Sequence, residues 1–163
     1  MRQSNRFITR DLCTGLLVSL LLVCVPAYAE TGIEMTGGWA DTQTADDLQS
    51  GAGSDLWPTS ESASDALSIT ITTPVSDWRV DVQRDNDLWH ANLHLWYQRT
   101  GDGIGGEISG GGTYQEITIL VSSFFSGTGA SSNIPIQLKI TGISIQVPSG
   151  VYTTTITVTV VDI

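Results

Sequence analysis

The chain has 163 residues, and its 17 acidic side chains outnumber 7 basic ones, for a net charge of −10 at pH 7. A surface with this much negative charge repels the phosphates of nucleic acids and the head groups of anionic membranes. We therefore expect neither as a partner. The length is that of one domain built around a single core.

Residues 1–29 have the layout of a cleavable secretion signal. Three arginines in the first ten residues precede an apolar run from Leu16 to Val25, and Ala27-Tyr28-Ala29 follows. Basic, apolar and small-residue regions in this order are typical of a signal peptidase substrate. The run is shorter than the roughly twenty residues that span a membrane. We therefore expect cleavage after Ala29 and a secreted protein of the periplasm or cell surface.

Removal of this segment changes the composition of the protein. It leaves 134 residues with four basic and sixteen acidic side chains, a net charge of −12. Both cysteines, Cys13 and Cys24, leave with the signal. The mature chain then has no disulfide and no thiolate metal site, so its fold depends on its core alone.

The next stretch, residues 30–66, is predicted to be an acidic, loop-rich N-terminal arm, followed by a β-sandwich domain over residues 67–163. Residues 40–66 carry six acidic and no basic side chains among many Ser, Thr, Ala and Gly residues. Such a composition is typical of long loops. Leu56 and Trp57, directly before Pro58, are the candidate anchors of the arm.

Strand patterns begin after residue 66. Leu67, Ile69 and Ile71 alternate with polar residues, and the same period of two recurs over 78–83 and 89–99. This period marks strands with one buried face. Residues 85–87, Asp-Asn-Asp, favour a turn, so the sequence predicts a hairpin over 78–99.

The C-terminal half continues this pattern. Seven glycines within 101–112 predict a loop with a short edge strand at 104–108, and strands are expected at 114–121, 134–140, 143–147 and 152–160. Residues 126–133 are expected to form a loop, and Pro135 indicates an edge strand or a strand start. Seven or eight short strands without a helix predict an all-β fold, a single antiparallel β-sandwich of the immunoglobulin-like kind.

Few residues suggest metal or catalytic chemistry. His90 and His94 lie four apart on a predicted strand, roughly 13 Å from each other, too far to share a zinc ion. Asp81, Asp85 and Asp87 fit either tight-turn chemistry or a calcium site. We find no phosphate-binding loop and no nucleophile turn in the sequence. We therefore predict a protein that is not an enzyme and holds no cofactor.

Trp96 stands out because it falls on the polar face of its strand, beside His94 and Gln98. An exposed tryptophan on a sandwich face can stack on a sugar ring, contact a partner or pack under a loop. These three residues are the candidate glycan or partner contacts.

The C-terminal run from Pro148 to Val160 reads PSGVYTTTITVTV. It resembles the closing strand of chaperone–usher pilus subunits of the spore-coat-protein-U type, which end on Gly-x-Tyr followed by alternating Thr and Val. The resemblance implies a pilin-like sandwich that assembles by strand exchange, in which the N-terminal arm of one subunit completes the sheet of the next.

The candidate exchange arm consists of Ile33, Met35, Gly37 and Trp39. The alternative is that 33–39 forms the first strand of its own domain, which costs no association entropy. We expect a structural or adhesive surface subunit, with a homo-oligomer or another surface component as partner. The alternative is a carbohydrate-binding module that uses Trp96.

Overall fold

The computed structural model describes residues 32–72, 77–85 and 88–163, so the predicted signal peptide lies outside the described residues. Its elements are nine strands and one short 3-10 helix. In chain order they are β1 (Gly32–Gly37), η1 (Ala45–Asp47), β2 (Thr59–Glu61), β3 (Leu67–Thr72), β4 (Asp77–Arg84), β5 (His94–Arg99), β6 (Ile104–Gly110), β7 (Gln115–Glu116), β8 (Ser122–Thr141) and β9 (Ile156–Asp162).

Strand β8 organises the sheet, because its twenty residues pair with five other strands. β4, β3 and β2 follow one another along one edge of β8, and β6 and β5 follow one another along the opposite edge. β9 extends the sheet beyond β4, β1 extends it beyond β3, and β7 pairs with β5. All of these pairings are antiparallel.

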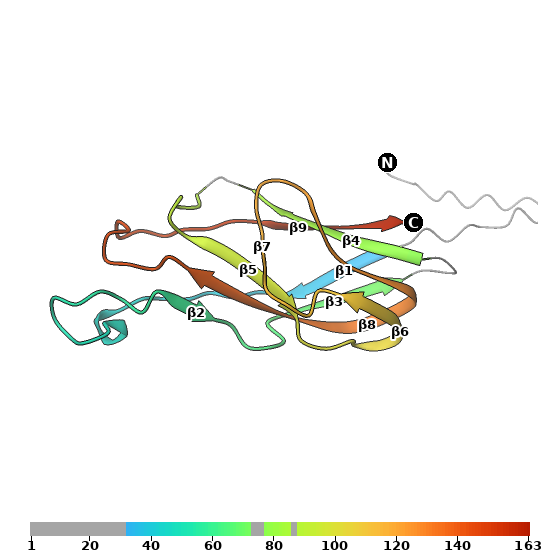
Figure 1. Cartoon of the computed structure of the whole chain (residues 1–163), viewed down its shortest axis with the longest axis horizontal. Helices are drawn as coiled ribbons and strands as arrows, with labels where there is room; N and C mark the ends of the chain where they lie inside the picture. The colour runs from blue at the N-terminus through green and yellow to red at the C-terminus, as the bar shows by residue number, and fades with distance from the viewer. Residues whose placement is uncertain (1–31, 73–76, 86–87) are drawn as a thin grey trace, which may run out of the picture.

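The sheet becomes a sandwich because β8 bends in its middle (Figure 1). The bend includes Gly129 and Asn133, whose φ angles are 69° and 54°. The first half of β8 lies with β4, β9 and β6, and the second half lies with β3, β1, β5 and β7. The antiparallel all-β sandwich predicted from the alternating residues is confirmed.

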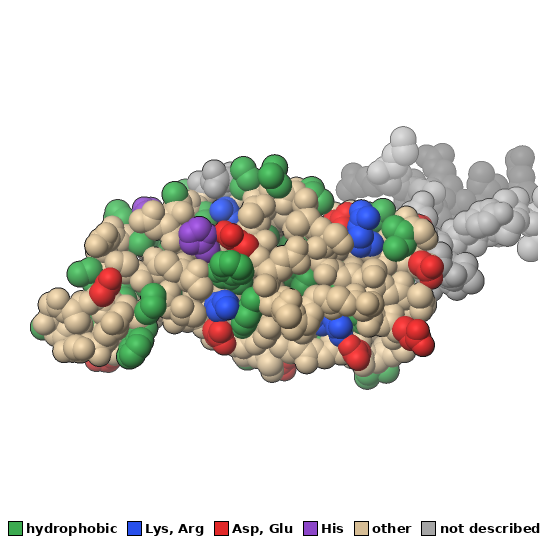
Figure 2. Space-filling view, viewed as in Figure 1, with side chains coloured by type: hydrophobic (Ala, Val, Ile, Leu, Met, Phe, Trp, Pro, Cys, Tyr) green, Lys and Arg blue, Asp and Glu red, His purple; other side chains and the backbone are tan. Residues whose placement is uncertain are grey.

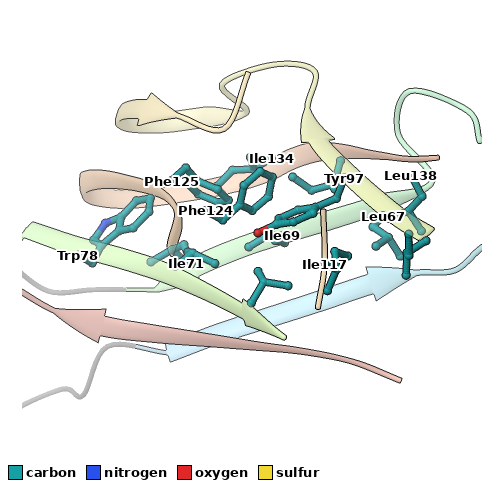
Figure 3. Packing of buried hydrophobic residues seen from close by; sticks show 14 residues of the cluster. Leu67, Ile69, Ile71, Trp78, Tyr97, Ile117, Phe124, Phe125, Ile134 and Leu138 are labelled. Atoms are coloured by element: carbon teal, nitrogen blue, oxygen red, sulfur yellow. The ribbon is translucent and has the colours of Figure 1, made fainter. Parts of the chain in front are cut away.

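The core lies between the two halves and takes its side chains from both (Figure 3). Trp78 of β4 is fully buried, donates its indole N–H to the Gly129 carbonyl at 2.8 Å, and packs edge-on against Phe125. Burial of side chains of this size contributes about 1.5–3 kcal/mol each. The cluster consists of Leu67, Ile69, Ile71, Trp78, Val80, Val82, Leu95, Tyr97, Ile117, Phe124, Phe125, Ile134, Ile136 and Leu138.

The hairpin predicted over 78–99 is wrong. β4 lies between β8 and β9, whereas β5 lies between β7 and β8. Trp89 donates its indole N–H to the Leu93 carbonyl at 2.6 Å, and the Leu93 N–H donates to the His90 carbonyl. Residues 89–93 therefore close a local loop instead of continuing a strand. Alternation identifies the buried face of a strand and leaves its partner undetermined.

The predictions for residues 126–140 are also wrong in part. The expected loop at 126–133 belongs to β8. Pro135 lies inside this strand, opposite Ser68 of β3, and on the other side of β8 it falls between the parts that pair with β6 and with β5. A register shift between Ile69 and Ile71 and the positive φ of Asn133 lie close to it. Proline is tolerated within sheets at such irregularities.

Three other predicted strands are shorter than expected or absent. β7 covers only residues 115–116 of the expected strand over 114–121, and β9 begins at Ile156 instead of residue 152. Residues 143–147 form no strand. Ile119, Leu120 and Val121, expected in a strand, lie in an exposed loop.

Gly127 permits the close approach of Trp78 to β8. A Cβ atom at Gly127 would lie 2.6 Å from the Trp78 ring and 2.5 Å from the Glu107 carbonyl oxygen. We therefore expect Gly127→Ala to lower the free energy of unfolding by about 1–3 kcal/mol. Gly38→Ala is the matched control, because nothing lies within 4 Å of a Cβ atom there. Chemical denaturation measures both, and equal stability of the two variants would contradict this account of the bend.

Candidate functional site

The first candidate site is the outer face of β5. Alternation along this strand sends Leu95 and Tyr97 into the core and leaves His94, Trp96 and Gln98 on the other face. Across from them on β8 lie Thr141, Lys139 and Gln137 in register. The structure therefore places the three predicted contact residues in one row, each with a polar neighbour on the next strand.

Cross-strand hydrogen bonds fix this row. His94 Nδ1 lies 2.7 Å from Glu116 Oε1, Trp96 Nε1 donates to Thr141 Oγ1 at 2.9 Å, and Gln98 Nε2 donates to Gln137 Oε1 at 2.9 Å. Figure 2 shows a histidine beside an acidic side chain on this side of the molecule, with apolar and basic side chains nearby. We call this surface the β5 face: His94, Trp96, Gln98, Tyr114, Glu116, Gln137, Lys139 and Thr141.

Lys139, the single lysine of the chain, occupies the centre of the β5 face. Its Nζ lies 3.6 Å from the centroid of the Tyr114 ring and 5.7 Å from that of the Trp96 ring, which are cation–π distances. Burial raises the pKa of Tyr114, and the negative charge of Glu61 raises it further. Tyr114 is therefore a neutral phenol at physiological pH.

Sequence reasoning missed Tyr114, Glu116 and the β8 residues of this face. The sequence predicts one longer strand over 114–121 for Tyr114 and Glu116, and the pairing of β5 with β8 joins residues about forty positions apart. A partial signal was present: Gln137 and Lys139 occupy the polar positions of the alternating run 134–140. The resulting surface combines aromatic rings with amide, imidazole and hydroxyl groups, which suits binding of a ring-shaped polar ligand.

The second candidate site is the predicted exchange arm. Ile33, Met35 and Gly37 lie in β1, which pairs in register with β3 of the same chain, and four of the six β1 residues are exposed. Trp39 lies beyond the end of the strand and packs, half-buried, against the core. In this structure residues 33–37 therefore belong to the first strand of their own domain, which is the alternative to an arm that pairs with a neighbouring copy.

The predicted acidic group is partly described. Arg79 donates two hydrogen bonds to the Asp81 carboxylate, at 2.7 and 2.9 Å. Asp85 accepts from the Thr154 hydroxyl at 2.9 Å, while Asp87 lies outside the described residues. Among the residues that the structure describes, no three His, Cys, Asp or Glu side chains gather as metal ligands.

The acidic tract is anchored by Asp55, whereas the sequence suggested Leu56 and Trp57. The Asp55 carboxylate accepts from the Ile145 and Leu56 backbone N–H groups, both at 2.8 Å, and from the Ser144 hydroxyl at 3.0 Å. These bonds lower its pKa, the bond from Ile145 most of all. Trp57 is 59% exposed. The Asp55 carboxylate thus ties the tract to the loop that precedes β9, beside the hydrogen bond from the Ile143 N–H to the Pro58 carbonyl.

The chain matches no family model, no curated protein and no solved structure. Within the described ranges, no helix is both long and apolar enough to cross a membrane. The function must therefore be inferred from the surfaces of the chain itself.

The lowered pKa of Asp55 gives a test of the anchor. A carboxyl group whose folded pKa is depressed stabilises the fold above its unfolded pKa, and this stabilisation is lost as the pH falls through the folded pKa. We expect an NMR titration to place the Asp55 pKa below 3.8. Because Asp55→Asn removes the ionisable group, the free energy of unfolding of this variant should decrease less than that of the unmodified chain as the pH falls below about 4. Ser144→Ala, which removes one of three donors, should have a smaller effect. An unshifted pKa would refute the anchoring role.

Proposed function

We propose that this protein is a secreted, non-enzymatic structural or adhesive surface subunit that assembles by exchange of β1 between copies. The observation that supports the proposal is the arrangement of β1. Among the described residues, β1 is hydrogen-bonded to β3 alone, and Met35 in its middle is 36% exposed. A terminal strand held by one neighbour can leave with the loss of a single ladder of hydrogen bonds.

The segment after β1 has the features of a hinge. Gly37 has a φ angle of 99°, Gly38 has open space around it, and residues 40–44 are exposed and irregular. Exchange replaces the pairing with β3 of the same chain by the identical pairing in a neighbour. Its main costs are association entropy and rearrangement of the hinge, so the balance between the two forms depends on protein concentration.

The assembly can be tested by light scattering of the protein over a range of concentrations, with and without residues 30–40. Ordered polymers that disappear on truncation are the expected result. Because loss of β1 can also unfold the domain, a second measurement uses single cysteines at positions that face each other, Glu34 and Thr70. A mixture of Glu34→Cys and Thr70→Cys chains should form mixed disulfides on oxidation.

The control mixture combines Glu34→Cys with Thr113→Cys, which lies in an exposed loop outside the strands. Strand exchange predicts more mixed disulfide in the first mixture than in the control. A monomer at every concentration, with equal disulfide yields in the two mixtures, would reject exchange of β1.

A second candidate function is carbohydrate binding by the β5 face, because the structure brings His94, Trp96 and Gln98 together with Lys139 and Tyr114. Trp96 is only half-buried, so part of its ring remains open for stacking.

If this second function is correct, Trp96→Ala should weaken binding to an oligosaccharide array about tenfold, the loss of one stacking contact. Trp96→Phe keeps a ring but not the N–H that donates to Thr141, and should retain most of the binding. Circular dichroism checks that both variants fold. Absence of binding by the unmodified protein, or binding unchanged in Trp96→Ala, would exclude the β5 face as a glycan site.

A further inference from the structure

The charged and aromatic side chains of the β5 face form one row across four adjacent strands. Glu61 of β2 lies opposite Lys139 of β8. Lys139 in turn lies opposite Trp96 of β5, and Trp96 lies opposite Glu116 of β7. Side chains at paired positions of neighbouring strands stand on the same side of a sheet. The row therefore consists of a carboxylate, an ammonium group, an indole and a second carboxylate, with the indole between a positive and a negative group.

Glu116 is an accessible hydrogen-bond acceptor on one side of the indole. Its Oε1 atom lies 2.7 Å from His94 Nδ1, and 36% of its side chain is exposed. The contact with His94 fixes the direction of the carboxylate. Because a carboxylate accepts hydrogen bonds at both of its oxygens, Glu116 can also receive a bond from a donor that lies over Trp96.

Lys139 supplies hydrogen-bond donors on the other side of the indole. Its side chain is half-buried, and its Nζ atom lies 3.6 Å from the ring centroid of Tyr114 and 5.7 Å from that of Trp96. The two rings hold the ammonium group in place by cation–π attraction. An ammonium group has three N–H donors and no acceptor. A ligand over Trp96 therefore meets donors on one side and carboxylate oxygens on the other.

This arrangement disfavours a charged ligand of either sign. A ligand carboxylate can only accept hydrogen bonds, and over Trp96 it would lie beside Glu116 in a chain whose net charge is −10. A ligand ammonium group can only donate, and it would lie beside Lys139. Hydroxyl groups both donate and accept. An uncharged, hydroxylated ring is therefore the ligand that satisfies both neighbours of the indole.

We propose that the β5 face binds an uncharged sugar, whose ring stacks on Trp96 while one hydroxyl accepts from Lys139 and another donates to Glu116. The inference rests on the second candidate function, carbohydrate binding by the β5 face, and adds the class of sugar and the residues that select it. Glu116 disfavours acidic sugars and Lys139 disfavours protonated amino sugars, because like charges in contact weaken binding.

An array that carries neutral, uronic-acid and amino-sugar oligosaccharides tests the class of the ligand. The protein should bind neutral oligosaccharides about tenfold more tightly than either charged class. Preference for an acidic or an amino sugar would overturn the inference and leave carbohydrate binding itself intact. Absence of binding to every sugar on the array would reject both the inference and the carbohydrate-binding function on which it rests.

Two substitutions test the residues that select the sugar. Glu116→Gln keeps the size of the side chain and removes its charge, so it should weaken binding of the neutral sugar about fivefold and reduce the discrimination against uronic acids. Lys139→Gln should reduce the discrimination against amino sugars for the same reason.

The matched control is Glu107→Gln, which removes an exposed carboxylate from β6, outside the β5 face. This variant has the same net charge as Glu116→Gln and should keep both the affinity and the preference of the unmodified protein. Circular dichroism checks that every variant is folded. Unchanged preferences in both Glu116→Gln and Lys139→Gln, or equal effects of Glu116→Gln and Glu107→Gln, would overturn the inference.

Discussion

The bend of β8 is the constraint on which the rest of the structure depends. One strand serves both layers, so five other strands are positioned by the part of β8 with which they pair, and β1, β7 and β9 are positioned through β3, β5 and β4. The bend is stabilised where Trp78 donates to the Gly129 carbonyl and packs over Gly127, a position that has no room for a side chain. Displacement of this contact would therefore disturb the packing of β4 against β8 next to the bend.

The same geometry defines the β5 face and the two ends of the strand order. The second half of β8 supplies Gln137, Lys139 and Thr141 to the β5 face, in register with His94, Trp96 and Gln98. The first half holds β4, and β4 in turn holds β9, so that β9 and β1, the two ends of the strand order, lie close together. The polar row of the β5 face and the approach of β9 to β1 are thus determined by different halves of one strand.

The local pattern of the sequence predicted the buried faces well and the strand pairing poorly. The alternating residues of 67–71, 78–82 and 134–138 all lie in the core, because the period of two directly reflects which side of a strand is buried. Pairing between β5 and β8, or between β4 and β9, joins distant segments and leaves no local signal. Trp96 could be assigned to an outer face, but Tyr114 and Lys139 reach it only through these long-range pairings.

The position of β8 near the C-terminus also affects how the chain can fold. Its partners β2, β3, β4, β5 and β6 all precede it, so none of them has its central neighbour until residues 122–141 are available. Contacts of such large sequence separation slow folding, because a long loop must close before any pairing compensates for the lost entropy. The preceding strands should therefore stay unpaired with β8 during synthesis until residues 122–141 have left the ribosome.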